Sequence, residues 1–214
     1  MEGSQPLVMD ALRESTKDLH ADTEGHQFQK DLGSGRVRKD LYVKYLGQLY
    51  LMHKHLADLL PAAASSDSRI AEVLKPYHSD LSAVIGDLGY FDASTDSVVP
   101  LTATASLLGV MDELSGRAPY SLLVHLYVLE GSTNGAKFMA KTLRSGLGLP
   151  EDRGAKYFDR YGDLQRERWT NFKATMNAQG FEQGEIEAIV VEAKRMFQTF
   201  FEIGCELEAL PSAV

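Results

Sequence analysis

The sequence predicts an all-α protein with a single domain. Apolar residues recur three and four positions apart in most segments, which is the period of an amphipathic helix. Only residues 97–99 hint at a strand, and this stretch is too short to form a sheet. A chain of 214 residues, 44% of them hydrophobic, is long enough to bury one core without disulfides.

The helical period is continuous within seven segments, so we expect seven or eight helices. Pro76 should kink the third segment or delay its start, because proline lacks the N–H that a helix interior uses. Glycine, proline and small polar residues separate the segments, as is typical of loops. The segments cover residues 12–24, 41–59, 70–88, 107–114, 120–143, 164–176 and 186–200.

Composition excludes several functional classes. The 30 acidic and 22 basic residues give a net charge of −8, which argues against a nucleic-acid partner but leaves room for a local basic patch. Cys205 is the single cysteine, so no intrachain disulfide is possible and a reducing compartment is expected. We find no signal peptide and no apolar run that could span a membrane, and therefore expect a cytoplasmic protein. Residues 1–6 are expected to be a flexible N-terminus, 7–210 the domain and 211–214 a tail.

The first helical segment contains a candidate metal ligand. Val8, Leu12, Ser15 and Leu19 share one predicted helix face, and His20 borders that face. A neutral imidazole at the edge of an apolar face could ligate a heme iron. The alternative is a partly buried histidine paired with a carboxylate one turn away.

The segment from Tyr127 to Phe138 contains two glycines four positions apart, Gly131 and Gly135. Each glycine costs a helix about 1 kcal/mol relative to alanine. One turn apart, they could clear a stripe of backbone for a flat ligand, or let the helix bend. Close packing of two helices through small residues is the alternative explanation.

Three basic residues are candidates for binding a ligand's carboxylates. Arg13 and Lys17 lie one turn apart on the His20 helix, and Lys173 lies in a later segment. They could equally be solvated surface charges. The chain has no Glu-x-x-His pair, Walker loop, G-x-G-x-x-G or G-x-S-x-G motif, and with one cysteine it cannot attach heme covalently through C-x-x-C-H.

Together these segments resemble the heme oxygenase family. Leu12–Glu24 is similar to the family's proximal helix, including the Thr-Lys-x-x-His-x-x-x-Glu spacing. The resemblance implies that His20 is the axial iron ligand and that Glu24 is its carboxylate partner. It also implies that Arg13, Lys17 and Lys173 hold the heme propionates and that Tyr127 lies against the cofactor.

The segment Glu130-Gly131-Ser132-x-x-Gly135 resembles the family's distal helix in its bacterial form. The resemblance implies that Gly131, Ser132 and Gly135 form the face that meets O2. Many family members have aspartate directly after the first distal glycine, where it organises the waters that deliver protons. Ser132 occupies that position here, which leaves turnover less directly implied than heme binding.

The implied fold is a single-domain multi-helix bundle with heme b between the proximal and distal helices. The implied reaction is O2- and electron-dependent cleavage of heme to biliverdin, CO and ferrous iron, with heme as both cofactor and substrate. Electrons must come from an external donor, such as a ferredoxin or an NADPH-dependent reductase, because the chain has no flavin or iron–sulfur motif. A phytochrome that uses biliverdin is a further expected partner.

Three other functions remain open from the sequence. A heme carrier without turnover would share the same fold. This alternative stays open because Ser132 replaces the aspartate that many family members have in the distal helix. A thiamin-degrading relative on this scaffold would need a catalytic cysteine, for which Cys205 is the single candidate. A helical interaction module would leave the paired glycines unexplained.

Overall fold

The computed structural model describes residues 7–211 and contains ten α-helices within them. The expected flexible N-terminus and most of the expected tail lie outside the described residues. None of the helices in the described part is both long and apolar enough to cross a membrane. The helices are α1 (Val8–Gly25), α2 (Gln27–Ser34), α3 (Lys39–Ser66), α4 (Ser68–Val73), α5 (Ser82–Tyr90), α6 (Thr102–Arg117), α7 (Leu122–Gly131), α8 (Ala136–Leu147), α9 (Gln165–Asn177) and α10 (Gln183–Glu208).

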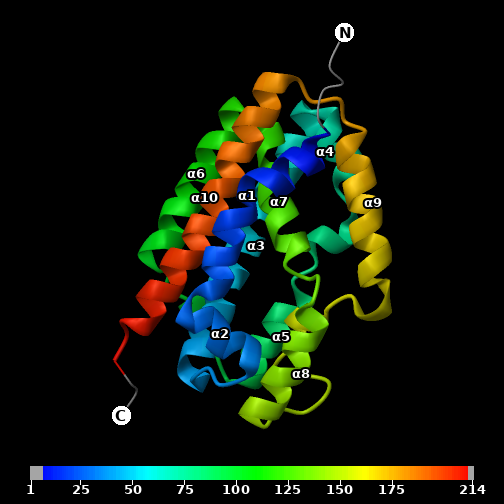
Figure 1. Cartoon of the computed structure of the whole chain (residues 1–214). Helices are drawn as coiled ribbons and strands as arrows, with labels where there is room; N and C mark the ends of the chain where they lie inside the picture. Colours follow the sequence, from blue (N-terminus) through cyan, green and yellow to red (C-terminus); the bar gives the residue numbers. More distant parts are fainter. Residues whose placement is uncertain (1–6, 212–214) are drawn as a thin grey trace.

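The bundle is organised around α7. Every residue of α7 from Leu122 to Glu130 is buried except Tyr127, which is half-buried. A helix that is apolar on all sides must be enclosed by other elements. The long helices α1, α10 and α6 lie side by side on one face of α7, and α9 flanks it on another (Figure 1).

The first and last helices pack along each other through most of α1 (Figure 1). The Thr23 hydroxyl donates to the backbone oxygen of Leu19 at 2.7 Å and approaches that of Phe197 at 3.3 Å, which ties the end of α1 to α10. At the other end of α1, Met9 N donates to Asn177 Oδ1 at 3.1 Å. Since Asn177 ends α9, the helices α1 and α9 run in opposite directions.

The all-α prediction is confirmed, and α3, α6, α9 and α10 cover the segments in which the helical period is clearest. The predicted helix over 70–88 is wrong in its continuity, because α4, a short 3-10 turn at Pro76–Ser79 and α5 replace it. Lys75 is extended (φ −125°, ψ 152°), as expected for the residue before a proline. The hint of a strand at 97–99 corresponds instead to a 3-10 turn at Thr95–Ser97.

The expected count of seven or eight helices was too low. The short helix α2, which the periodicity did not reveal, follows α1 after a break at His26. The segment 120–143 is also divided, because Gly135 adopts a left-handed backbone conformation (φ +82°) between α7 and α8. Short helices carry too few turns for an apolar period to be recognised in the sequence.

Buried histidines make the fold sensitive to acid. His125 on α7 is fully buried, and its ring interacts with the backbone of Ser121. Burial lowers its pKa to about 4, and burial together with nearby Arg160, Lys75 and Arg168 lowers that of His78 to about 3. Both imidazoles are therefore neutral in the folded protein at neutral pH.

We predict that the free energy of unfolding falls as the pH is lowered from about 6.5 towards 4. In this range the unfolded chain binds protons that buried His125 does not, so each such histidine contributes a slope of up to about 1.4 kcal/mol per pH unit. Urea unfolding at several pH values measures this slope. His125→Leu removes one titrating group and should flatten the slope, and an unchanged slope in this variant would contradict the prediction.

Candidate functional site

His20 lies where α1 emerges from its packing against the bundle. Leu12 and Thr16, two turns and one turn earlier on the same stripe, are buried, whereas the side chain of His20 is 53% exposed. The ring packs edge-on against Phe197 of α10, with 5.4 Å between centroids. Its Nδ1 lies 3.5 Å from Glu24 Oε2, and within residues 7–211 its Nε2 has no hydrogen-bond partner. Ser15, expected on the buried face, is exposed, because Thr16 takes that position.

The two glycines of the predicted distal helix bracket a turn. Gly131 ends α7 and Gly135 precedes α8 with φ +82°, so they do not share one helical stripe as the sequence suggested. Side chains of the turn bond the carbonyl three residues back: Ser132 Oγ donates to Leu129 O at 2.8 Å, and Asn134 Nδ2 donates to Gly131 O at 3.0 Å. Satisfying the last carbonyls of α7 in this way stabilises the break.

Trp169 on α9 brings three of the predicted residues together. A Cβ added to Gly131 would lie 3.4 Å from the indole edge, so the glycine permits close approach of this ring. Tyr127 stacks on Trp169 with 5.8 Å between ring centroids, and Lys173 Nζ lies 5.7 Å from the indole centroid. Sequence reasoning did not select Trp169, although it is the chain's single tryptophan and lies one helical turn before Lys173.

The proximal and distal segments face each other through Tyr127. Burial raises the pKa of Tyr127, and its interaction with Thr16 and the charge of Arg13 partly offset this effect, so its hydroxyl lies near α1. The helices α1 and α7 run in the same direction along the bundle (Figure 1). His20 lies one turn beyond Thr16, and Gly131 lies one turn beyond Tyr127. This register places the imidazole and the glycine turn at the same level.

The predicted basic residues lie at the surface. Arg13 is already paired with Glu14 at 3.0 Å, and both side chains are more than half exposed. Lys17 is exposed and has no ion-pair partner among the described residues. Lys173, also exposed, lines a cavity of about 520 Å³ together with Gly135 and Trp169. Lys173 therefore meets the distal turn, whereas no contact joins Arg13 or Lys17 to it.

A buried ion pair lies directly behind the distal turn. Arg160 Nη2 donates to Glu130 Oε1 at 3.1 Å, and the Tyr161 hydroxyl donates to the same oxygen at 2.8 Å. Burial raises the pKa of Glu130, and the charge of Arg160 and the bond from Tyr161 partly offset that effect. This contact could not be predicted from the sequence, because Arg160 and Tyr161 lie 30 and 31 residues after Glu130 and in different elements.

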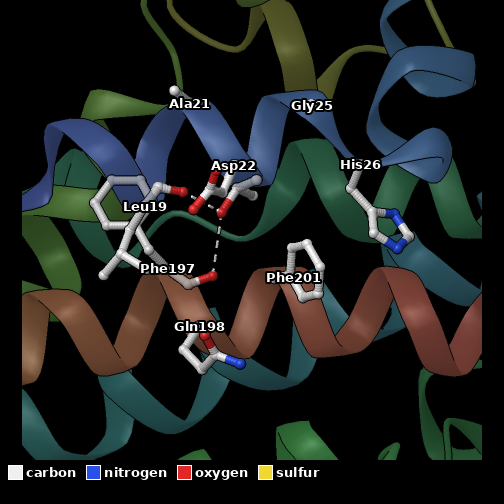
Figure 2. A pocket seen from close by; sticks show the side chains of 9 residues that line it. Leu19, Ala21, Asp22, Gly25, His26, Phe197, Gln198 and Phe201 are labelled. Atoms are coloured by element: carbon white, nitrogen blue, oxygen red, sulfur yellow. Dashed lines mark hydrogen bonds between the residues drawn. The ribbon is translucent and has the colours of Figure 1, made fainter.

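A cavity of about 550 Å³ between α1 and α10 lies outside this arrangement (Figure 2). Its lining includes Leu19, Phe197, Phe201 and His26, but none of the predicted site residues. Nδ1 of His26 accepts from Phe28 N at 3.2 Å, and its Nε2 lies 3.3 Å from Cys205 Sγ. Cys205, the single cysteine of the chain, therefore has His26 as a neighbour.

Comparison with known proteins identifies the family. The family model described as heme oxygenase matches residues 8–205. The chain belongs to the heme oxygenase family. Its relatives include a heme oxygenase of Rhodella violacea, 24% identical over 92% of this chain and 86% of that protein. Another relative is heme oxygenase 1 of Synechocystis sp., also 24% identical, over 92% of this chain and 83% of that protein.

Solved structures share the fold. Heme oxygenase-2 from Synechocystis sp. PCC 6803, in complex with heme and NO, superposes with a TM-score of 0.87 at 22% identity, over 95% of this chain and 86% of that one. The heme oxygenase from Leptospira interrogans superposes with a TM-score of 0.85 at 21% identity, over 94% of this chain and 100% of that one. At these identities the structural comparison establishes the fold.

Family membership confirms the function predicted from the sequence, an oxidoreductase that degrades heme. It does not favour a heme carrier without turnover. A thiamin-degrading enzyme and a pure interaction module are not favoured either, since the matched family is heme oxygenase over nearly the whole described chain.

We predict that Gly135 is required for its backbone conformation rather than for space. A Cβ at Gly135 would meet no atom within 4 Å, but a left-handed conformation costs most L-residues about 1–2 kcal/mol. Gly135→Ala should lower the free energy of unfolding by about this amount, and Gly135→Asn by less, because asparagine tolerates this conformation. Urea unfolding measures both changes.

The matched control is Gly184→Ala. Gly184 is exposed within α10, and a Cβ there also meets no atom within 4 Å, but its backbone is helical. Alanine should leave stability unchanged or raise it by up to about 1 kcal/mol. Equal effects of alanine at Gly135 and Gly184 would rule out the conformational explanation.

Proposed function

We propose that this protein cleaves heme to biliverdin, CO and ferrous iron, using O2 and electrons from an external donor. The observation that carries the proposal is the register of α1 and α7. It places the exposed imidazole of His20 opposite the turn that contains the two glycines Gly131 and Gly135. A single ligand on one side and a bare backbone on the other suit a flat metal-containing ring. Membership of the heme oxygenase family supports the same reaction.

The residues of α1 fit the iron-ligand role. Nε2 of His20 is accessible and has no partner among the described residues, and Nδ1 lies 3.5 Å from Glu24 Oε2. A carboxylate at the second ring nitrogen favours the tautomer that presents a lone pair at Nε2 and makes the imidazole a stronger donor. Phe197 supports the ring from α10 and restricts its rotation.

The distal turn contributes shape and dipoles rather than acid–base side chains. We propose that Gly131, Ser132 and Gly135 form the surface that faces O2. The Ser132 hydroxyl donates to Leu129 O, which leaves its oxygen as an acceptor for water. Glu130, the nearest carboxylate in sequence, is only 3% exposed and is held by Arg160 and Tyr161. Heme, when bound, supplies both the iron that activates O2 and the ring that is oxidised.

Basic residues at the rim would bind the propionates. Lys17 and Lys173 are exposed, and Arg13 would exchange its surface contact with Glu14 for a propionate at little cost. Tyr127 and Trp169 offer a flat aromatic surface beside Lys173. We propose a ferredoxin or an NADPH-dependent reductase as the electron donor, a cytoplasmic location, and a biliverdin-using phytochrome as one recipient of the product.

We predict that His20→Ala abolishes the native axial ligation of the iron. The variant lacks the accessible nitrogen but should retain the aromatic and basic surroundings, so hemin should still bind with a changed spectrum. Hemin titration followed by absorbance, and turnover with ascorbate or a reductase in air, test this. His55→Ala is the control, because His55 lies on α3 and is paired with Asp112 at 2.8 Å. A wild-type spectrum and full turnover in His20→Ala would refute the ligand assignment.

We predict that the basic residues control which meso carbon is oxidised. Removing Arg13, Lys17 or Lys173 singly should weaken heme affinity little, since an exposed ion pair contributes at most about 1 kcal/mol, but should change the ratio of biliverdin isomers. The α isomer is expected to dominate in the wild type. Chromatography of the products measures the ratio, and Lys194→Ala, an exposed lysine on α10, is the control. Unaltered affinity and isomer ratios in all three variants would mean that these are solvated surface charges.

A further inference from the structure

A second cavity, of about 530 Å³, lies on the far side of Glu130 from the glycine turn. It is bounded by α5, by the start of α9 and by the segment 152–161 that precedes α9. Four basic residues contribute to its lining: Arg153, Lys156, Arg160 and Arg168. None of the residues assigned to the heme site lines it.

Arg160 has an unsatisfied donor in this cavity wall. Its side chain is only 7% exposed. Nη2 donates to Glu130 Oε1 and, at 3.4 Å, to Leu129 O, but the buried Nη1 has no hydrogen-bond partner within the described chain. A buried donor without a partner is destabilising, so an acceptor that reached it would be stabilising.

Arg168 is a second cation without a counter-charge. Its guanidinium lies 4.1 Å from the ring centroid of Tyr77 and 4.4 Å from that of Tyr161, so two aromatic rings hold it in place. No carboxylate of residues 7–211 lies within 4.0 Å of it. Arg160 contacts the same Tyr161 ring at 4.8 Å. Two guanidinium groups thus share one phenol ring, and Glu130 forms an ion pair with Arg160 but not with Arg168.

The acidic residues of the cavity are already engaged. Asp152 Oδ1 lies 3.6 Å from Arg153 Nε, and Asp80 Oδ1 accepts a hydrogen bond from Ser82 N at 2.9 Å. Asp87 Oδ2 accepts from Tyr157 N at 2.7 Å, and burial raises the pKa of its carboxyl group. Asp80 stays charged: the bonds from Ser82 lower its pKa, as do the charges of Arg168 and Arg160, which it partly compensates.

The neighbouring buried histidine experiences the same positive field. The pKa of His78 is lowered to about 3, first by burial and then by the charges of Arg160, Lys75 and Arg168. His78 packs against the ring of Tyr77 at 4.5 Å, so it lies behind the ring that holds Arg168. Arg160 and Arg168 therefore both act on this corner of the fold, in a chain whose net charge is −8.

We propose that this cavity is a binding site for an oxyanion, held by Arg160 and Arg168 and assisted by Lys156. Guanidinium forks match the oxygen atoms of phosphate and carboxylate groups, and Arg168 presents such a fork beside the rings of Tyr77 and Tyr161. A phosphate dianion neutralises two cations at once, which makes it the preferred ligand group. The cavity exceeds the size of a phosphate ion, so it can hold a small organic phosphate.

Inorganic phosphate is the probe for the test. Calorimetric titration of the heme-free protein, at ionic strength held constant with NaCl, should show saturable one-to-one binding. Arg168→Ala should weaken binding by at least about tenfold, because it removes the fork and one charge. Arg168→Lys should give an intermediate loss, because it keeps the charge but not the planar fork. Arg166→Ala, an exposed arginine of the same helix that lines the Lys173 cavity instead, should bind phosphate as the wild type does.

Thermal unfolding of each variant checks that the variant is folded. If Arg168→Ala does not fold, Lys156→Ala, a change at an exposed position, takes its place in the titration. Titration with succinate alongside phosphate decides between the two oxyanion classes, and either one binding through Arg168 supports the site. The proposal is overturned if neither anion binds the wild type at millimolar concentration, or if Arg168→Ala and Arg166→Ala weaken binding equally. Heme turnover does not enter these measurements, so the result is independent of the proposed reaction.

Discussion

The arrangement of the molecule depends on the burial of a helix that has no polar face. Leu122–Glu130 is enclosed on all sides, and the surrounding helices pack where they do because α7 must be covered. Each apolar side chain buried in this way contributes about 1.5–3 kcal/mol. The fixed position of α7 then fixes the point at which its last residue, Gly131, reaches the surface beside Trp169. The geometry of the distal turn is thus set by the core.

The two sides of the proposed site differ in how many elements contribute their residues. On the proximal side, one amphipathic helix carries the proposed ligand His20, its carboxylate neighbour Glu24 and two basic residues within a few turns. On the distal side, residues from α7, α9 and the segment before α9 converge on the turn. Glu130, Arg160 and Tyr161 lie behind it, and the bond from Arg160 to Leu129 O connects them to the carbonyl that Ser132 also uses. A change in the position of Arg160 would therefore alter the hydrogen bonding of the same carbonyl group that Ser132 uses in the distal turn.

Much of the fold could be predicted from the sequence, because long helices repeat their apolar period several times. The 28 residues of α3 and 26 of α10 give clear signals, whereas α4, with six residues, gives none. His20 and Glu24 could be paired because helical spacing is local. The positive φ of Gly135 and the contact of Trp169 with Gly131 could not be predicted. The first depends on how α7 and α8 are held by the rest of the bundle, and the second joins residues 38 positions apart.

The position of Trp169 gives the protein an internal optical reporter. It is the single tryptophan of the chain, and its indole lies against Gly131, stacks on Tyr127 and has Lys173 above its ring. Its emission therefore originates at the proposed heme site rather than from an average over the molecule. Any change in polarity or ring stacking beside the distal turn changes that emission directly, so ligand arrival and local rearrangement can be followed in the unlabelled wild-type protein.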